Sequence, residues 1–311
     1  MRAIAKVLKR DPSTISRELR RNRSHSSTWL RLSAYERANE AHLRAKRRVS
    51  MAHQGIRSSL KLVKIREHIV EQLREFRTSP ELIAMELPQF FEKERVSGKT
   101  IRRWIKAQQP QLMECLRERG KKRRCRVVRR RNTKKAAPAK ISIHQRDESV
   151  DLHTQVGHYE IDLIVCSQSK VNILSIRELK TRFLKLYRCH NRKAETINSK
   201  LAAFFSQLPE PMLKTVTEDN GAEFEHTYKL KSSFDVEFYN CDPYCSWQKG
   251  SVENANRLVR EYLPKGTNLS VINQTWLDDI AWRINNRPMR CLGIQRPINC
   301  FKNEINLAAA A

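Results

Sequence analysis

Hydrophobic residues change their spacing partway along this chain of 311 residues. Up to about residue 118 they recur at helical spacing among many Arg, Glu and Ala residues, which predicts helices. From Gly157 onward, short apolar runs alternate with helical patterns, which predicts strands and helices in one domain. Because the chain is also longer than one ordinary domain, we expect an α+β protein of several domains.

The second half of the chain has its elements in a characteristic order. They are strands 159–166, 171–176 and 183–187, helix 195–208, strands 213–217 and 235–239, and helix 251–263. Three strands joined by turns, then a helix and further strands, follow the order of the ribonuclease-H-like fold. We therefore assign residues 151–311 to an α/β domain with a mixed five-stranded sheet and flanking helices.

Two short helices are predicted at the start of the chain, over residues 2–8 and 12–19. Pro12 suits the first turn of a helix, and Asp11 or Ser13 can cap it. The segment has the form of a DNA-binding helix-turn-helix, which lays its second helix in the major groove. The alternative is an ordinary helical hairpin. The side chains expected to face the groove or its phosphates are Ser13, Thr14, Ser16, Arg17 and Arg20.

Lys9 stands at the turn position that glycine usually fills in this motif. A lysine held in the left-handed conformation there costs about 1 kcal/mol. The supporting helix that normally precedes the motif is missing, which favours an N-terminally truncated form of this DNA-binding region, residues 1–50.

A second helical region is predicted over residues 58–118. Ser79 caps a helix that has Pro80 at its first position, and an amphipathic helix over residues 60–76 precedes it. A further capped helix, over residues 96–105, has a basic face. That face favours DNA contact and structural packing equally, and its DNA-contact candidates are Lys99, Arg102 and Arg103.

The chain carries a formal net charge of +28 and has a pI near 10.2. Such an excess of basic residues favours a polyanionic partner, above all nucleic acid. A ribosome-associated protein and a membrane-surface binder are the alternatives. The basic run at residues 121–131, within a predicted linker at 119–150, is expected to be a flexible arm on phosphates. A further basic helix is predicted over residues 31–48.

Other classes of protein are disfavoured. No apolar run approaches the roughly 20 residues that span a bilayer, so we expect no membrane partner. The eight cysteines are scattered and the chain has no signal peptide, which indicates a reducing cytoplasm rather than a disulfide framework.

Three carboxylates stand at meaningful points of the predicted fold. Asp162 lies in the middle of an apolar strand, where a charge is costly without a partner. Asp219 follows the next parallel strand, at the edge where ligands bind in α/β sheets, and Gly221 allows a sharp turn there. Glu253 lies near the start of a later helix. Together the three acids can hold two Mg²⁺ ions, which clamp the attacking and leaving oxygens of a phosphoryl transfer.

Taken singly, each of these acids has an ordinary explanation. An Asp-Asn-Gly sequence is usually just a turn, and a helical glutamate is usually solvated or paired, here with Arg257. Glu160, Glu218 and Glu223 are close competitors. The three acids together indicate a metal site because the elements that carry them follow the order of the predicted fold.

Several stretches of the sequence resemble transposases of the bacterial insertion-sequence-thirty family. The helix-turn-helix and the Ser-Pro-Glu at residues 79–81 match it, and the most specific block ends at Glu253. The further matching stretches are 157–162 (GHYEID), 219–224 (DNGAEF), 242–254 (DPYCSWQKGSVEN), 263–267 (LPKGT), 285–288 (NNRP) and 291–293 (CLG).

The resemblance implies a DDE transposase that binds the inverted-repeat ends of its element, nicks DNA and joins the new 3′-OH to a target strand. Asp162, Asp219 and Glu253 fall on the family's catalytic, metal-binding triad, with two Mg²⁺ or Mn²⁺ ions. Trp247 and Lys249 are candidates for contacting the DNA end by stacking and charge, and packing is the alternative for Trp247. The partners implied are double-stranded DNA and further copies of the chain, in a dimer or larger assembly in the bacterial cytoplasm, at the nucleoid.

The sequence departs from the family at a few positions. Tyr159 stands where the family has Trp, Ile161 where it has Gly, and Val252 where it has Asn; residues 167–170 replace a Gly- and Lys-rich turn. None of these removes a metal ligand. An inactive DNA-binding remnant that represses transposition, and another recombinase with an integrase core, remain the alternatives.

Overall fold

The computed structural model describes residues 5–6, 9, 11–22, 40–44, 46–48, 62–92, 94–116, 141–165, 169–243 and 245–310. The predicted basic arm at 121–131 lies outside these residues. Much of the predicted helix at 31–48 also lies outside them. Its described residues, 40–44 and 46–48, are helical. Within the described parts, no helix is both long and apolar enough to cross a membrane.

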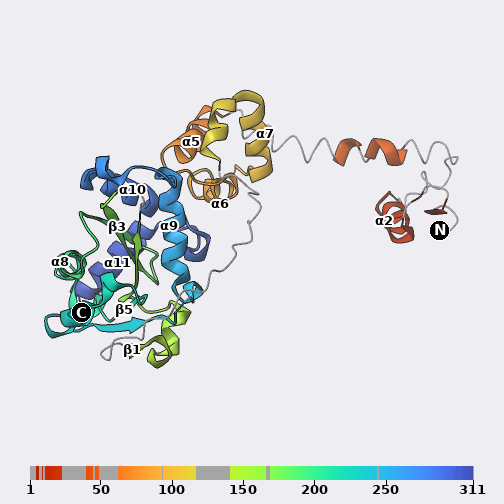
Figure 1. Ribbon diagram of the computed structural model, residues 1–311. Helices are drawn as coiled ribbons and strands as arrows, with labels where there is room; N and C mark the ends of the chain where they lie inside the picture. Colours follow the sequence, from red (N-terminus) through yellow and green to blue (C-terminus); the bar gives the residue numbers. More distant parts are fainter. Residues whose placement is uncertain are drawn as a thin grey trace.

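A mixed sheet forms the centre of the second half of the chain (Figure 1). Across the sheet the strands run in the order β1-β6-β5-β2-β3-β4. β2 and β4 flank β3 in antiparallel pairs, whereas β2, β5, β6 and β1 are joined by parallel pairs. The bounds are β1 (Ile141–Ser142), β2 (His158–Ile164), β3 (Asn172–Glu178), β4 (Leu184–Cys189), β5 (Thr215–Glu218) and β6 (Glu237–Asn240). This strand order confirms the ribonuclease-H-like fold.

One strand of the sheet was not predicted from the sequence. All five predicted strands are present, but β1 adds a sixth to the described sheet, parallel to β6 at its edge. It lies in the segment that was assigned to the basic linker, so residues 141 and 142 of the predicted linker belong to the sheet. Two residues are too few for an alternating pattern to register.

Alternation along β2 divides its side chains between two faces of the sheet. Tyr159, Ile161 and Leu163 are buried on the face covered by α8 (Ala194–Phe205). Each such apolar side chain contributes about 1.5–3 kcal/mol when fully buried. Ile164 packs on the opposite face, against α9 (Gly250–Tyr262) and α10 (Gln274–Asn285). Asp162, two residues before it, therefore lies on the α9 side of the sheet.

The predicted second helical region folds around a core of its own. It consists of α5 (Val63–Arg74), α6 (Pro80–Phe90), α7 (Gly98–Gln108) and the short η1 (Pro110–Cys115). Ser79 and Ser97 cap α6 and α7 as expected, accepting from the backbone N–H of Leu82 and Thr100. Close packing explains the glycine at position 98, because a Cβ there would lie 3.0 Å from the Glu81 backbone. The buried apolar side chains of this core are Ile65, Ile69, Leu73, Ile83, Leu87, Val96, Ile101, Trp104, Ile105 and Leu112.

The helix of the N-terminal motif, α2, spans Pro12–Asn22 and starts at the proline as expected. Asp11 caps it, because the Ser13 N–H donates to Asp11 Oδ1 over 2.8 Å. Lys9 has a φ of 50°, so the turn does hold a lysine in the left-handed region. A glycine at this position would remove the conformational strain of the left-handed lysine.

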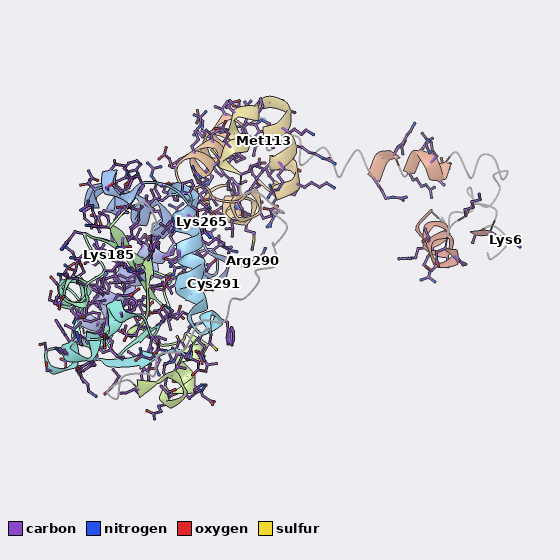
Figure 2. The ribbon with its side chains drawn as sticks, in the orientation of Figure 1. Lys6, Met113, Lys185, Lys265, Arg290 and Cys291 are labelled. Atoms are coloured by element: carbon purple, nitrogen blue, oxygen red, sulfur yellow. The ribbon has the colours of Figure 1, made fainter. Side chains whose placement is uncertain are left out.

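The helical unit (residues 62–116) is docked on the half of the chain that contains the sheet, through a buried carboxylate. Glu86 of α6 is only 1% exposed. It accepts from Arg296 over 2.7 Å and lies 3.7 Å from His68 Nε2. Burial alone would raise the pKa of Glu86, but the neighbouring His68 and Arg296 bring it below its ordinary value. Arg290, labelled in Figure 2, also reaches the unit, with Nη2 3.7 Å from Met85 Sδ.

A second set of contacts surrounds the turn after α5. Arg77 donates to the carbonyl of Glu261 in α9, and Arg287 donates to the carbonyl of Arg77. Arg287 also pairs with the Glu261 carboxylate at 3.3 Å. The rings of Phe76 and Trp282 lie 5.6 Å apart, so apolar and charged contacts together join the helical unit to α9 and α10.

We expect Arg296→Met to loosen this interface. Glu86 would stay buried with only His68 beside it, and breaking a buried pair by removing one partner is strongly destabilising. Because the Arg296 side chain is partly exposed, we expect a loss of about 2–3 kcal/mol in the free energy of unfolding. Urea denaturation at pH 7 measures it. Arg283→Met is the control, since it breaks the more exposed pair with Glu75; equal losses in both variants would contradict a special role for Glu86.

Candidate active site

Two of the predicted carboxylates meet at the edge of the sheet. Asp162 lies in β2 and Asp219 directly follows β5, and these strands are parallel neighbours. The ammonium of Lys249 joins them, with Nζ 3.0 Å from Asp162 Oδ1 and 3.4 Å from Asp219 Oδ2. It also donates to the carbonyl of Ile161 over 3.2 Å. The two aspartates are therefore close enough to share one cation.

Lys249 ends a short 3-10 helix, η7 (Ser246–Lys249), that leads directly into α9. The residue is 5% exposed. Burial alone would lower the pKa of Lys249, but the charges of Asp162 and Asp219 raise it above its ordinary value. Lys249 was predicted to contact DNA; in this structure it points inward and is held by the two aspartates.

Asn256 is a site residue that the sequence did not reveal. Its Nδ2 donates to Asp162 Oδ2 over 2.6 Å, so both carboxylate oxygens of Asp162 have partners from one connected segment. Asn256 lies three residues after Glu253, on the same face of α9. This spacing is a signal in the sequence that could have identified it.

The turn after β5 holds the carboxylate of Asp219. The Gly221 N–H donates to Asp219 Oδ1 over 2.9 Å. Gly221 was predicted to allow a sharp turn, but its φ of −63° suits any residue. The need for glycine is instead one of space, because a Cβ there would lie 2.8 Å from Asp219 Oδ1 and from Glu223 Cδ.

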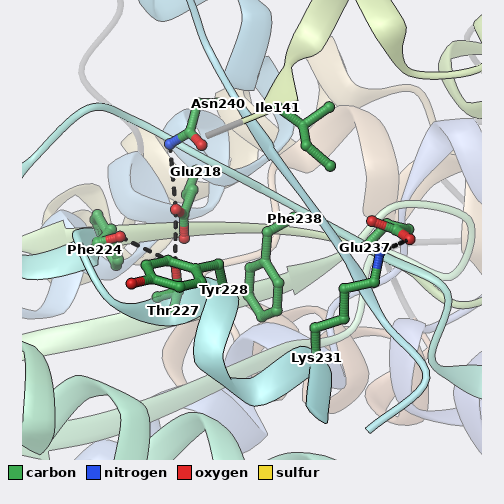
Figure 3. Close-up of a pocket in the computed structure, with 9 residues that line it drawn as sticks. All are labelled: Ile141, Glu218, Phe224, Thr227, Tyr228, Lys231, Glu237, Phe238 and Asn240. Carbon is green, nitrogen blue, oxygen red and sulfur yellow. Dashed lines mark hydrogen bonds and ion pairs between the residues drawn. The ribbon is translucent and has the colours of Figure 1, made fainter. Parts of the chain in front are cut away.

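Glu218, one of the competing acids, belongs to a polar network with Thr227 and Asn240 (Figure 3). Its Oε1 accepts from Thr227 Oγ1 over 2.8 Å and from Asn240 Nδ2 over 3.2 Å. Asn240 Nδ2 also lies 3.2 Å from the carbonyl of Asp219. These residues border a cavity of about 210 Å³. Glu218 therefore supports the strand end that carries Asp219.

The other two competing acids also have structural partners. Glu160 Oε2 accepts from the Val252 N–H over 2.7 Å, so this buried carboxylate holds the first turn of α9. Burial raises the pKa of Glu160, against the opposing effect of that backbone bond. Glu223 pairs with Arg192 at 3.0 Å. The structure thus gives each competitor a role in holding the fold.

Glu253 is not brought to the two aspartates. It lies exposed in the first turn of α9, and among the described residues its carboxylate has no hydrogen bond or ion pair. In the same part of the chain, no three side chains of metal-ligating type gather around one point. Glu253 follows Lys249 by four residues and precedes Asn256 by three. Both Lys249 and Asn256 contact Asp162.

The remaining predicted contacts differ in their exposure. Trp247 is 72% exposed, so the alternative that it packs in the core is wrong. On α7, Lys99 and Arg103 are exposed. Arg102 instead makes two hydrogen bonds to Glu81, of 3.1 and 2.7 Å. On α2 the side chains of Ser13, Thr14, Arg17 and Arg20 are exposed, and that of Ser16 is half-buried.

The chain is similar to several known proteins. A family model described as a helix-turn-helix domain matches residues 1–22. The solved catalytic core domain of BIV integrase is similar at 14% identity with a TM-score of 0.37, over 47% of this chain and 94% of that one.

Three curated relatives match almost the whole chain. The chain is 34% identical to the transposase for insertion sequence element IS1086 of Cupriavidus metallidurans, covering 96% of this chain and 87% of that one. It is 31% identical to transposase InsI for IS30A of Escherichia coli (99% and 80%), and 29% identical to the transposase for IS4351 of Bacteroides fragilis (100% and 92%). The chain therefore belongs to the IS30 family of transposases.

Proposed function

We propose that this chain is a DDE transposase that binds the inverted repeats of its own element and performs metal-dependent cleavage and transfer of DNA strands. The observation that carries the proposal is the pair Asp162 and Asp219, on adjacent parallel strands, with a cation between their carboxylates. Two carboxylates that already hold an ammonium offer the oxygen ligands that Mg²⁺ and Mn²⁺ prefer. The donor set therefore fits divalent metal.

Each residue has a distinct part in this proposal. Asp162 and Asp219 hold the metal, and Asn256 fixes the orientation of Asp162 through its 2.6 Å hydrogen bond. Glu253 would complete the ligand set from the first turn of α9, the helix whose start Glu160 holds. When bound, a metal pair supplies an activated water or 3′-OH and stabilises the departing oxygen.

DNA binding is assigned to two exposed surfaces. The α2 side chains are proposed to read the inverted repeat, and Lys99 and Arg103 of α7 to contact the same DNA further along. The net charge of +28 favours such contacts through release of counterions from the phosphates. Since two element ends must be brought together, we propose a dimer or larger assembly, acting on nucleoid DNA in the bacterial cytoplasm.

Purified full-length protein and labelled duplex DNA with the element's inverted repeat test the proposal. We expect nicking at the repeat in the presence of Mg²⁺ and none with EDTA. A shifted band without nicking under all metal conditions would instead support the second candidate, a DNA-binding repressor, for which the helix-turn-helix match over residues 1–22 is the supporting observation. Binding no tighter than to a scrambled duplex would overturn both.

Trp247 gives a separate prediction about the DNA end. A tryptophan 72% exposed beside the site is suited to stacking on an unpaired base. We expect Trp247→Ala to weaken binding of a pre-cleaved repeat end roughly tenfold, because stacking contributes about 1–3 kcal/mol per base. Fluorescence anisotropy in EDTA measures this. Trp276→Ala, which removes an exposed tryptophan from α10, should change little; if the two variants lose affinity equally, stacking at Trp247 is excluded.

A further inference from the structure

Lys249 occupies the space that the proposed metal requires. Its Nζ contacts one oxygen of each aspartate, and the residue is almost fully buried. An ordinary DNA-contacting lysine is exposed and strongly hydrated. The buried ammonium must therefore do something inside the site, and the charges it faces are the two carboxylates.

The charge balance explains why a lysine is tolerated there. Without a cation, Asp162 and Asp219 would present two like charges that repel each other. The ammonium neutralises one of the two charges and holds the carboxylates toward one point. A divalent ion would do the same with twice the charge, and the two cations would repel each other at this short range.

The segment that carries Lys249 has room to change. Lys249 is the last residue of η7, and the next residue, Gly250, has open space where a Cβ would stand. Trp247, in the same short helix, is largely exposed. Because Lys249 lies on η7, a shift of this segment would leave the strands that lead to the two aspartates in place.

We propose that Lys249 is a built-in competing cation, which keeps Asp162 and Asp219 together in the metal-free protein and must leave before metal binds between them. This inference rests on the proposed function, because it assumes that the two aspartates are metal ligands. Lys249 is then a positioning residue that lowers the affinity for metal while it preserves the geometry of the ligands.

The test is a Mn²⁺ titration of the full-length protein, with free Mn²⁺ followed by electron paramagnetic resonance. We expect Lys249→Met to bind Mn²⁺ about tenfold or more tightly than the wild type, because one competing charge has gone. Lys265→Met is the matched control: it removes an exposed charge beyond the far end of α9 (Figure 2) and should leave the affinity unchanged. Asp219→Asn should abolish the tight binding.

A second variant guards against a folding defect. Lys249→Gln keeps N–H donors for Asp162 without the charge, and should also bind Mn²⁺ more tightly. In both variants Mn²⁺ should raise the melting temperature by more than it does in the wild type. If the wild type binds Mn²⁺ through Asp219 and neither variant binds it more tightly than Lys265→Met, the inference is overturned and the metal site stands. If no protein binds Mn²⁺, the proposed metal site fails, and the inference with it.

Discussion

Replacing Asp219 with Asn lowers the rate of DNA cleavage by at least about a thousand-fold, because a metal ion contributes several kcal/mol and each 1.4 kcal/mol is worth about tenfold. Asparagine has the same shape and keeps an oxygen for the Gly221 N–H, so the turn after β5 should survive. What is lost is the negative charge that faces the cation. Single-turnover cleavage of labelled inverted-repeat DNA in Mg²⁺ measures the effect.

Glu253→Gln should give a loss of similar size, although Glu253 stands apart from the aspartates in this structure. Its partner experiment is Glu237→Gln, which changes an acid that pairs with Lys231 outside the site. That variant should cleave at close to the wild-type rate, and all three should still bind DNA. Wild-type cleavage by Asp219→Asn would remove the metal site from the proposal, and wild-type cleavage by Glu253→Gln would remove only the third ligand.

Acidification from pH 6.5 to 4 destabilises the protein by roughly 3 kcal/mol through His158 alone. Burial, with the charges of Lys214 and Arg146, lowers the pKa of His158 to about 4. The unfolded chain therefore takes up a proton near pH 6.5 that the folded chain refuses until about pH 4. The stability is fully present above the unfolded pKa and falls as the pH drops through this window.

Urea denaturation of wild type and His158→Gln at several pH values between 7 and 4 measures this effect. The variant should be less stable at pH 7, because the 2.8 Å bond between His158 Nδ1 and Thr215 Oγ1 is changed, but its stability should depend less on pH. His190→Gln, at an exposed histidine, should keep the wild-type slope. Parallel curves for wild type and His158→Gln would show that His158 is accessible to protons in the folded state.

The sequence was informative where a pattern repeats. Alternation along β2 was enough to predict the strand and to mark Asp162 as a charge that needs a partner. Asp219 was predicted from its place after the next parallel strand, and the structure does bring the two together. The two-residue β1 has no pattern to detect, and its pairing with β6 depends on residues about 100 positions away.

The partners of the acids could not be predicted from the sequence. Lys249 lies 87 residues from Asp162 and 30 from Asp219, and only the packing of η7 against the sheet edge brings it between them. The same holds for Glu160, whose place at the start of α9 depends on how that helix crosses β2. Asn256 and Glu253 lie on one helix, and their spacing alone does not say which of them meets Asp162.

The docking of the helical unit through Glu86 and Arg296 has a consequence for where DNA would be cut. If α7 holds DNA as proposed, the contact between Glu86 and Arg296 would set the offset between that base pair and a phosphate at the paired aspartates. The unit would then act as a ruler along the element end. Its length would be set by the contacts of Glu86 with Arg296 and of Arg77 with Glu261.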